Sequence, residues 1–106
     1  MTFTELDHLI NESGRRSLAS RLISSLLDAL DAGEDNISLD VFESNTGYAR
    51  TNIRAVASFL SNAGVIKILY SNASSQDQHL HAEAKRGRWA RHHYTLAKHV
   101  RELHRR

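Results

Sequence analysis

Residues 37–70 read ISLDVFESNTGYARTNIRAVASFLSNAGVIKILY. Four apolar residues in the second half of this stretch recur at three- and four-residue steps: Ile53, Val56, Ala57 and Leu60. That spacing is typical of a helix with one buried face. Gly47 and Gly64 stand where turns would end two successive helices, and the β-branched run that follows is typical of a strand. The stretch therefore predicts a helix, a tight turn, a second helix and a strand.

Periodicity outside this stretch predicts the remaining elements. A wide apolar stripe marks the longest helix: Leu18, Leu22, Ile23, Leu26, Leu27 and Leu30. We expect helices over about 3–12, 17–32, 39–46, 50–63 and 97–105, with Thr4 and Ser38 as caps of the first and third. Strands are expected over about 65–70 and 88–96, with a short bridge at 37–39. The 106 residues suit one α+β domain, 1–106, mostly helical with a small antiparallel hairpin.

This arrangement resembles the winged helix–turn–helix of bacterial and archaeal regulators. The matching positions are Ser38-Leu39, Phe42, Gly47, Arg50-Thr51-Asn52, Ile53, Val56, Leu60 and Ala63-Gly64-Val65-Ile66, with a weaker match at Tyr94-Thr95-Leu96. MarR-like, PadR-like and plasmid or phage regulators share this pattern. The chain departs from it at Ala49, where such regulators carry a serine or threonine cap, and Thr51 or Asn45 are the alternative caps. The resemblance implies a winged-helix regulator of transcription, for example a repressor.

The distribution of charge points to a polyanionic partner independently of that resemblance. Residues 1–48 carry three bases and nine acids, whereas residues 49–106 carry eleven bases and three acids. The 50–63 helix contains no acid, and arginine and asparagine can bond guanine and adenine edges in bidentate fashion. We therefore expect this helix, together with the turn residue Tyr48, to contact double-stranded DNA in the major groove through Tyr48, Arg50, Thr51, Asn52, Arg54, Ala55 and Ser58.

A second basic cluster surrounds Gly87. Four of the seven residues from 85 to 91 are bases: Lys85, Arg86, Arg88 and Arg91. In a hairpin this cluster would form a wing tip that contacts phosphates. The alternative interpretation is a solubilising hairpin with no partner.

The leucine-rich stripe also predicts a homodimer, because it exceeds what one small core obviously needs. The expected interface comprises Leu6, Leu9, Ile10, Ile23, Leu27, Val100 and Leu103. A symmetric dimer would bind two half-sites about one helical turn of DNA apart.

Other classes of function find little support in the sequence. His79 and His81, with His92 or His93, offer imidazoles, but the chain has no cysteine, so we predict no metal site. Phosphate loops, HExxH motifs and nucleophile elbows are absent, so we predict no enzyme and no cofactor. Residues 63–70 are too short to cross a bilayer, and acids near the N-terminus do not suit a signal peptide, so we expect a cytoplasmic protein, on the nucleoid when DNA-bound. The alternatives are a plasmid or phage replication or partition protein, a winged-helix protein–protein adaptor without DNA binding, and an effector- or metal-sensing regulator.

Overall fold

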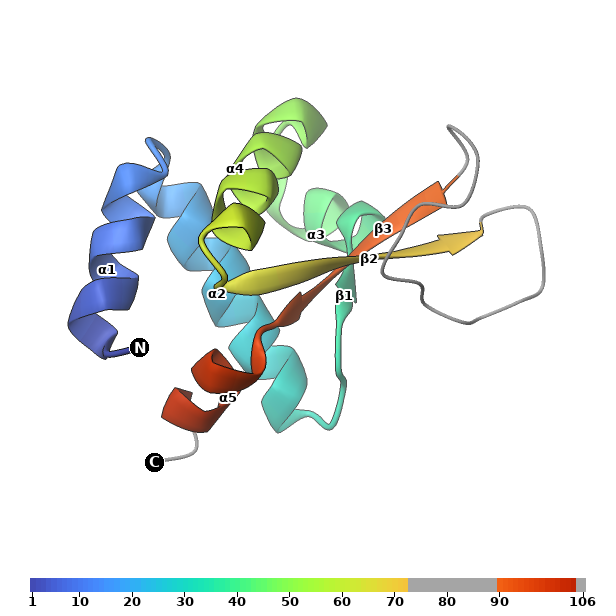
Figure 1. Cartoon of the computed structure of the whole chain (residues 1–106). Coiled ribbons are helices and arrows are strands. Elements are labelled where there is room, and N and C mark those ends of the chain that lie inside the picture. Colours follow the sequence, from blue (N-terminus) through green and yellow to red (C-terminus); the bar gives the residue numbers. More distant parts are fainter. Residues whose placement is uncertain (73–89, 105–106) are drawn as a thin grey trace.

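The computed structural model describes residues 1–72 and 90–104 (Figure 1). The elements follow in the order α1 (Phe3–Glu12), α2 (Arg16–Asp31), β1 (Ile37–Ser38), α3 (Leu39–Thr46), α4 (Arg50–Asn62), β2 (Ile66–Asn72), β3 (Ala90–Leu96) and α5 (Lys98–His104). The described part is α+β and mostly helical, with five helices and one small antiparallel sheet. This confirms the predicted fold class at that level, and the bounds lie within two residues of the expected ones.

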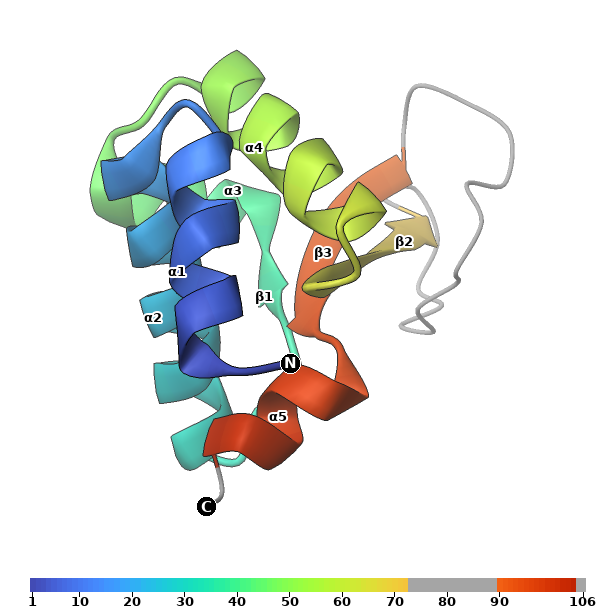
Figure 2. The same ribbon diagram turned by 60° about the vertical axis from the view of Figure 1, so that its left-hand side comes forward.

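The sheet has the order β1-β3-β2, with both pairs antiparallel. The long pairing runs from Ile66 opposite Leu96 to Asn72 opposite Ala90, whereas β1 contributes only Ile37 and Ser38 to the ladder. The helices α1 to α4 gather at one end of the β2–β3 hairpin, whose other end extends away from them (Figures 1 and 2). The hairpin therefore projects beside α4.

One apolar cluster joins the helices to the sheet. Its most deeply buried large side chains are Tyr94, Phe42, Leu22, Ile53, Leu60, Ile66, Val56 and Val65. The buried faces of α2 and α4 both contribute to this cluster, as their leucine and isoleucine spacing requires.

The first helix has the predicted bounds but a different cap. Thr2, not Thr4, caps α1: its Oγ1 accepts a hydrogen bond from the backbone N–H of Glu5 at 3.1 Å and donates one to Glu5 Oε1 at 3.3 Å. Thr2 and Glu5 have the spacing of a capping-box sequence, and the helix starts at Phe3, directly after this cap. Phe3 is consequently 66% exposed, outside the core.

The cap of α3 agrees with the prediction. Ser38 Oγ accepts a hydrogen bond from the backbone N–H of Val41 at 3.1 Å. Because Ser38 also ends β1, one residue both closes the strand and starts the helix.

Candidate nucleic-acid interface

The turn between α3 and α4 sets the position of α4. Gly47 ends α3 in the left-handed region, with φ 76° and ψ 4°, and Thr46 Oγ1 donates to the carbonyl of Phe42 at 2.7 Å. The rings of Phe42 and Tyr48 stack across the turn with their centroids 6.3 Å apart. Because Phe42 is a core residue, this contact ties the start of α4 to the interior.

The helix α4 has one buried side and one open side. Ile53, Val56, Ala57 and Leu60 are at most 1% exposed. The opposite side is exposed at Thr51, Arg54, Ala55 and Ser58, which we call the α4 outer face. At about 100° per residue, the three small side chains form its centre and Arg54 one flank. Asn52 is half-buried on the other flank.

The predicted alternative caps of α4 are not used. The helix starts at Arg50, after Ala49, and no side chain at the Ala49 position caps it. The expected start of this helix therefore stands, without the stabilisation of about 0.5–2 kcal/mol that a serine or threonine cap would add.

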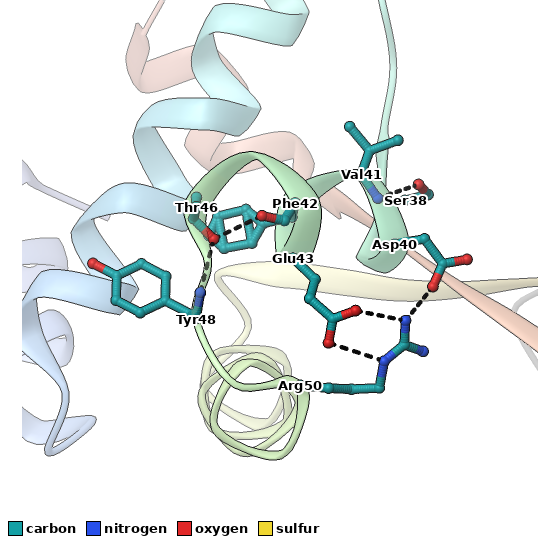
Figure 3. A network of polar contacts seen from close by, with 8 residues as sticks. All are labelled: Ser38, Asp40, Val41, Phe42, Glu43, Thr46, Tyr48 and Arg50. Atoms are coloured by element: carbon teal, nitrogen blue, oxygen red, sulfur yellow. Dashed lines mark hydrogen bonds and ion pairs between the residues drawn. The ribbon is translucent and has the colours of Figure 1, made fainter.

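Arg50 is held by two carboxylates of α3 (Figure 3). Its Nε donates to Glu43 Oε2 at 3.2 Å, and its Nη2 donates to Glu43 Oε1 at 3.1 Å and also to Asp40 Oδ1. We call these three residues the Arg50 clamp. The hydrogen bonds that Arg50 donates to Glu43 and, to a smaller extent, to Asp40 raise the pKa of Arg50 above its ordinary value.

The Arg50 clamp was missed in the sequence, and it changes one expectation. The absence of acids within the 50–63 helix suggested an unopposed positive face. The acids come instead from the preceding helix, where Asp40 and Glu43 lie three residues apart and so share one side of α3. Arg50 is therefore not an unengaged guanidinium at the start of α4.

Arg54 lies one turn beyond Arg50 and is exposed. No ion pair involves it within residues 1–72 and 90–104. It faces the β2–β3 hairpin: the pKa of His92 is lowered by burial and then by the charges of Arg54 and Arg50. The His92 ring also makes an edge contact with Tyr70, with centroids 5.0 Å apart. Arg54 is thus the flank of the α4 outer face that lies toward the hairpin.

A groove of about 310 Å³ borders the other flank of α4. Arg15 and Ser17 from the start of α2 line it together with Tyr48 and Asn52. Arg16 lines it too, but its guanidinium pairs with Asp7 at 2.9 Å. The two half-buried residues of the predicted interface, Tyr48 and Asn52, therefore meet at this groove.

Most of the predicted wing falls beyond the described residues. Lys85, Arg86 and Arg88 lie there. Arg91 is described: it is exposed on β3, opposite Ser71 of β2. Because successive strand residues point to opposite faces, Arg91 lies on the other face of the strand from His92.

The histidines do not form a metal site in the described part of the chain. His79 and His81 lie outside it. His93 Nε2 lies 2.9 Å from Ser71 Oγ, and its Nδ1 lies 3.1 Å from Asn36 Oδ1. In the neutral ring, Nδ1 donates to the amide oxygen and Nε2 accepts from the hydroxyl. Burial and then Arg91 lower the pKa of His93, and no group of three metal-ligating side chains occurs among the described residues.

The residues of the predicted dimer interface belong largely to the core of the protomer. Leu6, Ile10, Ile23 and Val100 are at most 9% exposed and pack in the apolar cluster. Leu9, Leu27 and Leu103 are half-buried. The surplus of apolar side chains on which the homodimer prediction depended is thus much smaller than the stripe suggested.

Comparisons with protein families, with curated proteins and with solved structures gave no match. None of the helices in residues 1–72 and 90–104 combines the length and the apolar composition that crossing a bilayer requires. Any assignment of function therefore depends on the geometry of α4 and its surroundings.

Proposed function

We propose that this chain is a winged helix–turn–helix protein that binds double-stranded DNA, with α4 in the major groove and the β2–β3 hairpin as the wing. The observation that carries the proposal is the α4 outer face: it is exposed, contains no acid and bears an arginine without an ion pair among the described residues. Behind it, the helix is anchored by side chains that are at most 1% exposed.

The shape of this face suits a groove. Thr51, Ala55 and Ser58 are small, so the backbone of α4 can approach base edges closely, and the two flanks supply the longer groups. Arg54 can donate two parallel hydrogen bonds to guanine O6 and N7, and Asn52 can pair with adenine N6 and N7. Sequence-specific binding of this kind suits a transcriptional regulator, and it suits a plasmid or phage replication or partition protein equally.

We also propose a homodimer, with a smaller apolar interface than the sequence predicted. Its apolar contacts would be the half-buried Leu9, Leu27 and Leu103, together with the exposed ring of Phe3. Analytical ultracentrifugation of the protein with and without a bound duplex tests it. A palindromic binding site and two protomers per duplex are expected, and a single protomer on an asymmetric site would remove the dimer.

Fluorescence anisotropy of a labelled random duplex at about 50 and 200 mM salt tests DNA binding directly. We expect binding that weakens as salt rises, with a log–log slope of about −0.9 for each phosphate neutralised. Selection from a random-sequence pool then gives the specific site. Binding at neither salt concentration would exclude the proposal and favour a protein–protein adaptor.

A charge-matched pair of variants locates the interface. Ala55→Asp puts an acid at the centre of the α4 outer face and should abolish binding. Ala32→Asp adds the same charge at an exposed position after α2 and should leave binding nearly unchanged. Equal effects of the two variants would mean that α4 does not face the DNA.

A further inference from the structure

The hydrogen bonds of Arg50 leave one part of its guanidinium unused. A guanidinium has five N–H donors, one on Nε and two on each Nη. Glu43 and Asp40 together occupy the Nε donor and both Nη2 donors. Figure 3 shows the third nitrogen, Nη1, directed away from both carboxylates, and no partner for it occurs among the described residues.

This pattern is incompatible with the bidentate recognition of guanine. That contact needs two parallel N–H groups from two neighbouring nitrogens. In a guanidinium, the neighbouring pairs are Nε with Nη2 and Nη1 with Nη2. Both pairs require Nη2, whose donors are held by Glu43 and Asp40. Nη1 alone can still donate to a single phosphate oxygen.

The charges of the Arg50 clamp lead to the same conclusion. Two carboxylates and one guanidinium give this cluster a net charge of −1 at the start of α4. The Asp40 and Glu43 side chains are 52% and 36% exposed, so without Arg50 both negative charges would face an approaching phosphate. Arg50 compensates one of these charges and joins the acids of α3 to the first residue of α4.

From these contacts we infer that Arg50 does not read a base: it is a positioning residue, held by Asp40 and Glu43, that presents Nη1 to a phosphate and shields the two carboxylates from the DNA. The inference rests on the proposed DNA binding. It assigns sequence discrimination to Arg54 and Asn52 and gives Arg50 a contribution that is the same for every sequence.

The test compares the affinities of each variant for the selected site and for a random duplex. Arg50→Ala should weaken binding to both by the same factor, about tenfold or more, so the ratio of the two affinities stays constant. Its salt slope should be shallower by about 0.9, because one phosphate contact is lost. Arg54→Ala, in contrast, should lower the ratio itself.

Two further variants separate the shielding from the phosphate contact. Asp40→Asn with Glu43→Gln removes two negative charges and should strengthen binding to the random duplex. Adding both changes to Arg50→Ala should recover part of the lost affinity, while the salt slope stays shallow. Thermal melts of all variants establish that each one folds.

Three results would overturn this role. If Arg50→Ala weakens only the selected site, Arg50 reads a base. If it changes neither affinity, Arg50 does not contact the DNA. If the amide variants rescue nothing, the carboxylates do not need shielding. If the unaltered protein binds no duplex at all, the proposed function fails as well. The three results above differ from that outcome because in each of them the unaltered protein still binds DNA.

Discussion

Substituting Gly47 with alanine tests whether the turn between α3 and α4 depends on backbone conformation. With φ 76°, Gly47 occupies a region that side-chain-bearing residues rarely adopt. A Cβ built at this position meets no atom within 4 Å. Steric collision with the rest of the molecule therefore contributes nothing, and the entire cost lies in the backbone.

The size of the effect follows from two opposing contributions. The left-handed conformation costs a residue with a Cβ roughly 1–2 kcal/mol. Alanine also restricts the unfolded chain, which offsets about 0.4–1 kcal/mol of that cost. We expect Gly47→Ala to lower the free energy of unfolding by about 1 kcal/mol, which corresponds to a decrease in Tm of about 4–8 °C for a chain of this size.

Gly47→Asn provides the control, because asparagine enters the left-handed region more readily than alanine. Urea denaturation followed by far-ultraviolet circular dichroism should rank the stabilities as glycine, asparagine, alanine. Asparagine is the larger of the two replacements, so an asparagine variant less stable than the alanine variant would indicate a collision. That order, or an alanine variant as stable as the original, would refute the reasoning.

Three other predictions follow from the described contacts. Arg54→Ala should weaken binding to the selected duplex by about 1–3 kcal/mol, measured by anisotropy, with an unchanged Tm; Arg21→Ala, which removes an exposed arginine of α2, should not. Folding lowers the pKa values of His92 and His93 below 6.5, so the unfolded chain binds protons at a higher pH than the folded chain does. The stability that the neutral histidines contribute should therefore be complete above about pH 6.5 and be lost as the pH falls below that value. In denaturation measurements from about pH 7.5 to 5, His93→Gln should make stability depend less on pH. Tyr94→Phe should leave stability unchanged or raise it by up to about 1 kcal/mol in thermal melts, because the buried Tyr94 hydroxyl has no hydrogen-bond partner among the described residues. Burial raises the pKa of Tyr94 to about 12, so the phenylalanine variant should also lose less stability above about pH 10.

Local patterns were sufficient to predict the helices and strands. The apolar residues of α2 and α4 recur at the spacing of a helix with one buried face. The β-branched run of β2 is typical of a strand. Ser38 as a cap was predictable for the same reason, since its partner lies three residues away. The cap of α1 was assigned to Thr4 because that threonine also has an acid three residues later, and only the structure distinguishes it from Thr2.

Contacts across the turn were beyond local patterns. Arg50 meets Glu43 and Asp40 only because Gly47 places the start of α4 against one side of α3. The dimer prediction did not account for how much apolar surface one protomer buries, because α1, α4 and the sheet all pack against α2 from directions that the sequence does not reveal. Val100 of α5 likewise belongs to this cluster and is only 2% exposed.

The short strand β1 is weakly attached to the sheet. Two residues of backbone pairing hold it to β3, so its attachment depends heavily on side chains: His93 bonds Asn36, and Thr95 Oγ1 donates to the carbonyl of Asp35 at 2.6 Å. The pairing between β1 and β3 can therefore break locally while β2 and β3 stay paired. In hydrogen exchange, backbone amides around Ile37 should therefore exchange faster than those in the middle of the β2–β3 ladder.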